Sequence, residues 1–198
     1  MNGTDVSKAS AAQAWRSAGG YLKEFYSATA KQKSRLVKKA PLADIGAAAL
    51  HHPDAFVRRG CLFFLDHYAN EASTAVFAEA LLDPVDFVRH AALHSIACET
   101  CRSEELCVAD VVPKIVRLLA EDPSPDLRTK AISTLLPLAG RDPRAIEAIQ
   151  RSSEDDADAI VRQAATDALQ GRFVAPRKRY ERRQRRHDRP AARWASGG

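Results

Sequence analysis

The 198-residue sequence lacks long apolar runs and is poor in cysteine. It contains no stretch of about 18 consecutive apolar residues, which excludes a membrane-spanning helix. Its beginning carries Asp5 and no apolar stretch before Ala30, unlike a secretory signal. The four cysteines are too few and too clustered for a disulfide framework in a chain of this length. We therefore expect a cytoplasmic protein that makes no membrane contact.

The sequence also lacks the local marks of common enzymes. It has no Gly-rich loop that could hold a phosphate. It has no G-x-S-x-G motif around a nucleophilic serine. Strand signals are absent as well. These absences favour a non-enzymatic, all-helical protein, with no catalytic residues, no metal and no cofactor.

Charge is strongly segregated along the chain. Residues 1–40 contain eight Lys and Arg against two Asp and Glu, residues 41–170 contain 12 against 21, and residues 171–198 contain ten against two. The net charge of +5 therefore hides an acidic middle between two basic ends. The basic isoelectric point belongs to the ends, so no basic groove is predicted in the middle.

Four segments of the sequence align on an arginine that recurs at intervals of 31, 39 and 34 residues. A small residue follows each arginine by three positions and a large aliphatic residue by seven. This spacing marks one face of a helix, and the small residue lets two helices approach closely. The arginines are Arg58, Arg89, Arg128 and Arg162; the small residues are Cys61, Ala92, Ala131 and Ala165; the aliphatic residues are Leu65, Ile96, Leu135 and Leu169.

A turn and a second apolar helix precede each arginine. In three of the four turns Asp or His is followed by Pro, which predicts a side-chain cap and a first helical residue. The upstream helices are predicted at Pro41–Leu50, Ser73–Leu82, Ala109–Ala120 and Asp142–Arg151. A period of 31–39 residues suits stacked helix pairs and excludes a β-propeller.

Over about residues 41–170 this pattern resembles HEAT and HEAT-like repeats, which carry a turn aspartate and a valine–arginine pair on the second helix of each unit, helix B. The sequence departs from that pattern at His52 and Ala157. The resemblance implies a short right-handed α-solenoid of about four helix pairs over residues 41–171. In the family the aspartates and arginines bridge neighbouring units, which implies a structural ladder. Its members here are Arg58, Asp83, Arg89, Asp122, Arg128, Asp156 and Arg162.

The family geometry also implies that helix B residues line a concave face and contact a partner protein. The candidates are Arg59, His67, His90, His94, Lys130, Ser133, Gln163 and Asp167.

Residues 1–40 are predicted to form a helical cap on the first unit. Ser10–Ser17 is one expected helix, with Ser10 as its N-cap and Gly19-Gly20 as its break. Tyr21–Ala28 and Lys31–Lys39 are further expected helical pieces. The expected packing residues are Tyr21, Phe25, Leu36 and Val37.

Residues 172–198 form an Arg-rich tail. Arg177–Arg189 contains no aliphatic residue, so this segment is expected to be disordered in isolation. Its arginines match phosphate geometry and its aromatic residues could stack on bases. The predicted binding site for nucleic acid, RNA or DNA, or another polyanion comprises Arg177, Lys178, Arg179, Tyr180, Arg182, Arg183, Arg185 and Arg186. The alternatives are a solubilising tail, a nuclear address, or an arm that folds back on the acidic middle.

One stripe of possible metal ligands runs along the second helix B. His94, Cys98, Cys101 and Cys107 could form a Cys₃His zinc site. Only one C-x-x-C is present, however, and small thiols are common where helices pack. Packed thiols are the favoured interpretation.

The sequence thus favours an adaptor whose helical repeats bind a partner protein and whose tail binds a polyanion. Enzymes with HEAT-type folds match the sequence less well. The di-iron hydroxylases hold their metals with His-Glu pairs, and no His-Glu dipeptide occurs here. The alkyl-base DNA glycosylases use a basic, tryptophan-rich surface, whereas this middle is acidic. A HEAT-like nucleic-acid-processing or nucleic-acid-binding protein remains the alternative.

Overall fold

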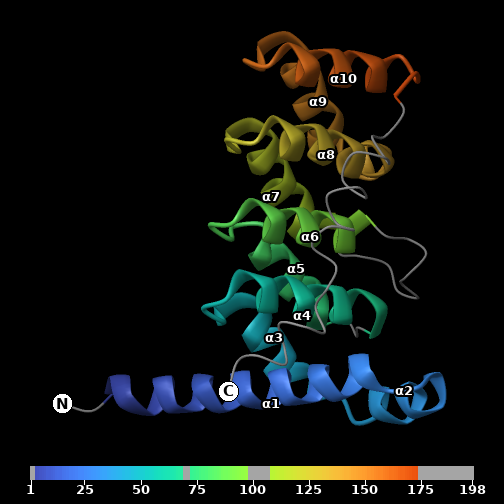
Figure 1. Cartoon of the computed structure of the whole chain (residues 1–198). Coiled ribbons are helices and arrows are strands. Elements are labelled where there is room, and N and C mark those ends of the chain that lie inside the picture. The colour runs from blue at the N-terminus through green and yellow to red at the C-terminus, as the bar shows by residue number, and fades with distance from the viewer. Residues whose placement is uncertain (1–2, 69–71, 98–107, 174–198) are drawn as a thin grey trace. The chain divides into compact units, whose positions relative to one another are not determined.

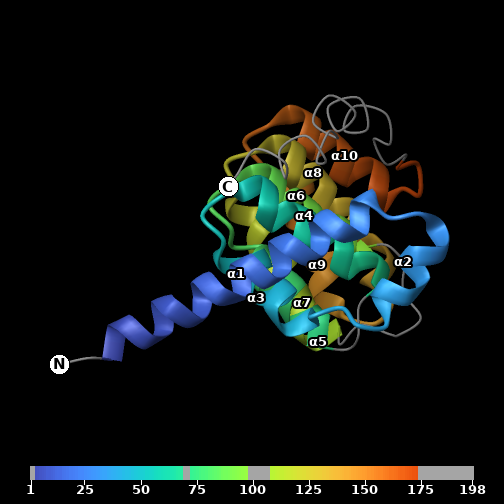
Figure 2. The same cartoon turned by 60° about the horizontal axis from the view of Figure 1, so that its bottom comes forward.

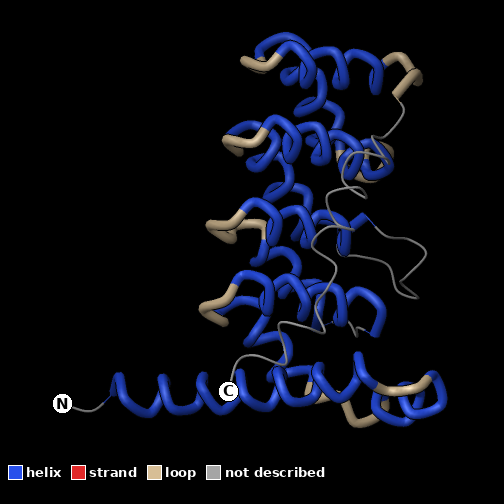
Figure 3. Tube along the Cα trace, viewed as in Figure 1, coloured by secondary structure: helices blue, strands red, loops and turns tan. Residues whose placement is uncertain are grey.

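The computed structural model describes residues 3–68, 72–97 and 108–173, and all regular structure in these ranges is helical (Figure 3). The all-α fold predicted from the sequence is confirmed. No described helix has the length and apolar character needed to cross a membrane. The elements are α1 Gly3–Ser27, α2 Ala30–Val37, α3 Leu42–His51, α4 Ala55–Tyr68, α5 Ala72–Ala80, α6 Asp86–Ala97, α7 Val108–Glu121, α8 Pro125–Leu135, a 3₁₀ turn Leu136–Leu138, α9 Pro143–Asp155 and α10 Ala159–Leu169.

The predicted alternation of helix A and helix B is confirmed along the chain. Helices α3, α5, α7 and α9 are the A helices, and α4, α6, α8 and α10 are the B helices. The ends of the A helices differ from the predicted ends by a few residues. The largest difference is at α9, which continues to Asp155. Frayed helix ends carry weak sequence signals, whereas apolar periodicity identifies the helix itself.

The described chain forms two compact units, the first ending at Val76 and the second beginning at Phe77. In the first unit α3 pairs with α4, and α1 packs along α3 and reaches α4 (Figure 2). Gly46 of α3 lies so close to Val76 that a Cβ atom built on it would be 3.3 Å from Val76 Cγ2. Glycine therefore permits this close approach between helices.

Helix α1 is one continuous helix from Gly3 to Ser27, so the predicted N-cap at Ser10 and the predicted break at Gly19-Gly20 are wrong. Ala18, Leu22 and Phe25 explain the difference, because they are at most 3% exposed and lie at helical spacing. Burying this face outweighs the roughly 1 kcal/mol that each interior glycine costs. Tertiary packing therefore decides this helix against local propensity.

An aromatic cluster joins α1 to α4 within the first unit. The Phe25 ring lies edge-on to the Phe64 ring, with centroids 5.0 Å apart, and Tyr21 meets Phe64 in the same way at 5.4 Å. Phe64 is 1% exposed, and Cys61 on the same helix is fully buried. Burial raises the pKa of the Cys61 thiol to about 12, so this cysteine is a packing residue.

The second unit is built from two layers of helices. Helix α7 packs on α9 in the A layer, while α8 packs on both α6 and α10 in the B layer (Figure 1). The small residues of the repeat are fully buried here, at Ala92, Ala131 and Ala165. Their lack of bulk lets successive B helices approach closely.

Helix α10 ends in a Schellman motif built around Gly171. The φ of Gly171 is +68°, a left-handed conformation that glycine adopts without steric cost. The N–H of Gly171 donates to the carbonyl of Ala168 at 3.2 Å, and the N–H of Arg172 donates to the carbonyl of Asp167 at 2.8 Å. These two bonds satisfy carbonyls that the helix end would leave unpaired.

Candidate functional site

Each turn between helix A and helix B in the second unit contains an aspartate whose carboxylate accepts the backbone N–H two residues later. The bonds join Asp83 to Val85 at 2.8 Å, Asp122 to Ser124 at 2.9 Å, and Asp156 to Asp158 at 2.9 Å. This is the Asx-turn, which the short carboxylate side chain forms readily. The turn holds each carboxylate in a defined position before helix B begins.

The prediction that the turn aspartate caps helix B, with the next proline starting it, is wrong. Helices α8 and α10 begin at Pro125 and Ala159, three residues after the turn aspartate. Ser124 caps α8 by accepting from the N–H of Leu127 at 3.4 Å. Asp158 caps α10 by accepting from the N–H of Ile160 at 2.8 Å. The polar residues two positions after Asp122 and Asp156 were the sequence signal for these two caps.

Arg89 makes the first complete bridge of the ladder in the second unit. We call such a bridge, from an arginine to the turn aspartate of the following unit, a rung. Its Nε and Nη2 donate to the two carboxylate oxygens of Asp122 at 2.7 and 3.0 Å. Its Nη1 donates to the carbonyl of Asp83 in its own turn at 2.8 Å. The two side chains of the ion pair are only 10% and 4% exposed. One guanidinium group therefore joins its own turn to the turn of the following unit.

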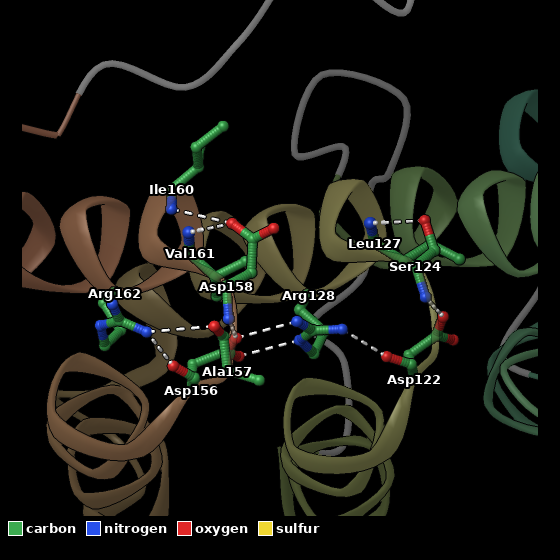
Figure 4. A network of polar contacts seen from close by, with 10 residues as sticks. All are labelled: Asp122, Ser124, Leu127, Arg128, Asp156, Ala157, Asp158, Ile160, Val161 and Arg162. Atoms are coloured by element: carbon green, nitrogen blue, oxygen red, sulfur yellow. Dashed lines mark hydrogen bonds and ion pairs between the residues drawn. The ribbon is translucent and has the colours of Figure 1, made fainter.

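Arg128 repeats this geometry one unit further along (Figure 4). Its Nε and Nη2 donate to Asp156, both at 2.8 Å, and its Nη1 donates to the carbonyl of Asp122 at 2.7 Å. The hydrogen bonds from Arg128 lower the pKa of the Asp156 carboxyl. The same bonds raise the pKa of Arg128, so both groups stay charged at neutral pH.

Arg162 is the last ladder arginine, and it makes only the contact to its own turn. Its Nη1 donates to the carbonyl of Asp156 and, at 3.2 Å, to that of Ala157 (Figure 4). Within the described ranges, no acceptor meets its Nε or Nη2. Arg89, Asp122, Arg128 and Asp156 are thus brought together as bridging pairs, whereas Arg162 ends the row.

The first unit keeps the turn but replaces its charge. Nδ1 of His52 accepts from the N–H of Asp54 at 3.0 Å, the bond that aspartate makes in the other turns. Burial lowers the pKa of His52, and its ring lies edge-on to Trp15 with centroids 5.4 Å apart. Arg58 Nη1 donates to the carbonyl of His52 at 2.7 Å. A neutral imidazole therefore serves as the turn acceptor here.

The surface positions on the B helices of the second unit follow a regular pattern. The residues one and five positions after each ladder arginine lie one helical turn apart, and all are at least partly exposed. Because the rungs hold α6, α8 and α10 in register, these positions align in two columns. We call them the helix-B surface: His90, Thr129, Gln163, His94, Ser133 and Asp167.

Lys130 is also partly exposed, and in the first unit His67 is exposed. Arg59, by contrast, is 7% exposed, with its guanidinium 5.1 Å from the Phe63 ring centroid. The prediction that Arg59 faces a partner is therefore wrong. Because Arg59 is charged, the sequence predicted an exposed side chain, but its long aliphatic part lets it pack against the Phe63 ring.

Two predicted sites fall outside the described residues. They are the thiols Cys98, Cys101 and Cys107 and the tail site Arg177, Lys178, Arg179, Tyr180, Arg182, Arg183, Arg185 and Arg186. In residues 3–68, 72–97 and 108–173, no three His, Cys, Asp or Glu side chains are grouped so that they could hold a metal ion.

Helix pairs stacked A on A and B on B, with an arginine–aspartate bridge between successive units, define an α-helical repeat protein. The family model described as HEAT repeats matches residues 96–170, from the end of α6 past the end of α10. Residues 96–170 are therefore similar to HEAT repeats, as the sequence pattern predicted. No curated protein and no solved structure gives a significant match to the chain. HEAT repeats commonly mediate protein interactions and are generally not enzymes.

Proposed function

We propose that this protein is a non-enzymatic scaffold that binds a partner protein on its helix-B surface. The observation that carries the proposal is the pair of rungs, Arg89–Asp122 and Arg128–Asp156, which hold three B helices in register. A surface fixed in this way loses little conformational entropy when a partner binds. The buried charges of the second unit support the same interpretation, because they serve turns, caps and bridges. These charges are Asp83, Arg89, Asp122 and Asp142.

Affinity capture with a matched pair of double variants tests the partner surface. Ser133→Arg with Gln163→Arg adds bulk and charge to the helix-B surface. Ser153→Arg with Gln150→Arg makes the same changes on α9, where Ser153 donates to a carbonyl three residues earlier at 2.7 Å, as Ser133 does. The partner captured by the wild-type protein should be lost only with the first variant. Equal capture by both variants would refute the assignment of the surface.

We further propose that the tail binds a polyanion, with RNA or DNA as the first candidate. The support is the charge of residues 171–198, ten Lys and Arg against two Asp and Glu. Phosphate contacts release counterions, so binding should weaken steeply as salt rises. Replacing six tail arginines by serine should remove both the binding and its salt dependence in fluorescence anisotropy with single-stranded RNA. These are Arg177, Arg179, Arg182, Arg183, Arg185 and Arg186.

The same measurement tests the alternative of a HEAT-like nucleic-acid-processing protein. Such a protein would bind nucleic acid through its helical repeats and keep its affinity after the tail substitutions. Residues 41–170 carry 12 basic against 21 acidic side chains, which disfavours that outcome. Retained tight binding by the tail variant would nevertheless favour the alternative over our proposal.

A further inference from the structure

Among the described residues, the guanidinium of Arg162 contacts acceptors only through Nη1. Its Nη1 contacts to the Asp156 and Ala157 carbonyls correspond to the contact between Arg128 Nη1 and the Asp122 carbonyl. In Arg128 the remaining edge, Nε and Nη2, grips the carboxylate of the next unit. The corresponding edge of Arg162 meets no acceptor among the described residues. It is therefore oriented for a carboxylate.

Leu169 is more exposed than the residues at the equivalent position of the other repeats in the second unit. It lies seven residues after Arg162, two helical turns along the same face. The equivalent residues Ile96 and Leu135 are 4% and 0% exposed, whereas Leu169 is 37% exposed. Ala165, between Arg162 and Leu169 in this pattern, is fully buried like its equivalents. The residue pattern of α10 thus repeats that of α8, whose arginine holds the turn of the following unit.

We propose that this face of α10, defined by Arg162 and Leu169 and called the α10 end face, binds a partner protein through an aspartate in a helix–turn–helix segment. The inference rests on the proposed scaffold function and adds a second surface with a stated partner chemistry. Its basis is continuity with the interface between α8 and α10, where Arg128 grips the turn carboxylate of Asp156. The partner's aspartate takes the position relative to Arg162 that Asp156 takes relative to Arg128.

Charge argues against the chain's own following segment as the occupant. Residues 174–198 contain nine Lys and Arg, and their only carboxylates are Glu181 and Asp188. Both lie among arginines that compete with Arg162 for them. A strongly basic segment also gains nothing from approaching a guanidinium edge.

A second copy of the chain offers no suitable turn among its described residues. Its Asp83 and Asp122 are each 8% exposed, and its Asp156 is already gripped by Arg128. Its first turn has His52 where the others have aspartate. Among these candidates, a carboxylate of another protein fits the open edge of Arg162 best.

The probe for this proposal is a synthetic peptide of residues 139–172 of this chain, which carries the turn aspartate Asp156 between two helices. Added to the full-length ¹⁵N-labelled protein, it should shift the side-chain Nε–H resonance of Arg162 saturably. With a fluorescent peptide, anisotropy gives the dissociation constant. The peptide with Asp156→Asn should bind at least about tenfold more weakly, because it lacks the negative charge that the Nε and Nη2 edge of Arg162 binds.

Matched variants of the protein locate the contact. Arg162→Lys keeps the positive charge but loses the paired N–H donors of the guanidinium group, so peptide affinity should fall at least about tenfold. Arg144→Lys is the control, because its Nε and Nη2 already donate to Asp142 at 3.0 and 2.7 Å. Leu169→Ser should also weaken binding, whereas Leu82→Ser, at another exposed leucine, should not. Circular dichroism of each variant verifies that it folds.

Four results would overturn the proposal: no saturable shift at Arg162, equal binding of the Asp156→Asn peptide, equal loss with Arg144→Lys, or a shift of the Arg162 resonance with protein concentration alone. Binding that appears only after Glu181→Gln and Asp188→Asn would assign the face to the chain's own tail and would also overturn it. Failure here is distinguishable from failure of the scaffold proposal, which is tested separately by the variants at Ser133 and Gln163.

Discussion

Replacing Arg128 by methionine tests whether the ladder stabilises the second unit. The substitution keeps a long side chain but removes three hydrogen bonds, two to the Asp156 carboxylate and one to the Asp122 carbonyl. Asp156 then retains the N–H of Asp158, at 2.9 Å, as the one described hydrogen-bond donor to its carboxylate. Its side chain is only 6% exposed, so water cannot fully replace the lost donors.

The expected cost is the penalty of leaving a buried charge without its partner. Removing one member of a buried ion pair typically destabilises a protein by about 3–5 kcal/mol. Since the Arg128 side chain is 11% exposed, we expect the lower end, about 3 kcal/mol. Adding Asp156→Asn removes the stranded charge while keeping an acceptor for the turn. The double variant should therefore be more stable than Arg128→Met alone, by about 1 kcal/mol or more.

Urea unfolding followed by circular dichroism measures these differences. With a typical denaturant dependence, a loss of about 3 kcal/mol lowers the urea midpoint by roughly 1–3 M. The matched control is Arg117→Met, because Arg117 makes an Nε bond of the same 2.8 Å length to Glu121 with side chains 66% and 63% exposed. The control should leave the midpoint essentially unchanged, since water and salt screen exposed pairs.

The reasoning is refuted if Arg128→Met and Arg117→Met shift the midpoint equally. It is also refuted if the double variant is less stable than the single variant. Either result would mean that the ladder bridge contributes no more than a surface ion pair.

Three further predictions concern the packing, the charge and the backbone. Ile96→Ala should cost roughly 2–5 kcal/mol in urea unfolding, and Leu169→Ala clearly less, since their exposures are 4% and 37%; the reverse order would contradict the assigned stacking. The lowered pKa of Asp156 adds stability above the ordinary aspartate pKa of 3.8, and this stability is lost as pH falls through the lower folded pKa; Asp156→Asn should flatten the acid limb of a pH series of thermal melts. Gly20→Ala should stabilise α1 by roughly 0.5–1 kcal/mol, since nothing lies within 4 Å of the position of its Cβ atom. Gly171→Ala should destabilise the protein by about 1–2 kcal/mol, because alanine is strained at φ +68°. Calorimetry that showed both variants stabilised, or both destabilised, would contradict the backbone argument.

The repeat pattern aligns the four arginines, because one helix face repeats with a fixed offset from each of them, and the resemblance to HEAT repeats implies their ladder role. It does not show what each nitrogen of an arginine contacts. Arg128 and Arg162 occupy the same position in the repeat, yet Arg128 binds a following carboxylate and Arg162 meets none among the described residues. That difference depends on whether another unit follows in space, which no local pattern records.

Local signals are weakest where two roles suit the same residue. Asp122 is a plausible cap by type and position, but the structure uses it as a turn and bridging residue and gives the cap to Ser124. Arg59 is a plausible surface residue by charge, but it is buried along Phe63. For Asp122 the deciding factor is Arg89, a partner distant in sequence. For Arg59 it is the length of the side chain, which reaches the Phe63 ring.

Hydrophobic periodicity and turn residues act locally, so the residues alone predict the helices, their pairing and the spacing of the arginines. Three features depend instead on packing in space: α1 continues through Gly19-Gly20, the turn carboxylates pair with arginines of the preceding units, and Leu169 stays exposed. These features depend on packing because burial and charge pairing are determined by residues that are close in space. The sequence determines which chemical groups are present, whereas the tertiary structure determines which of them are in contact.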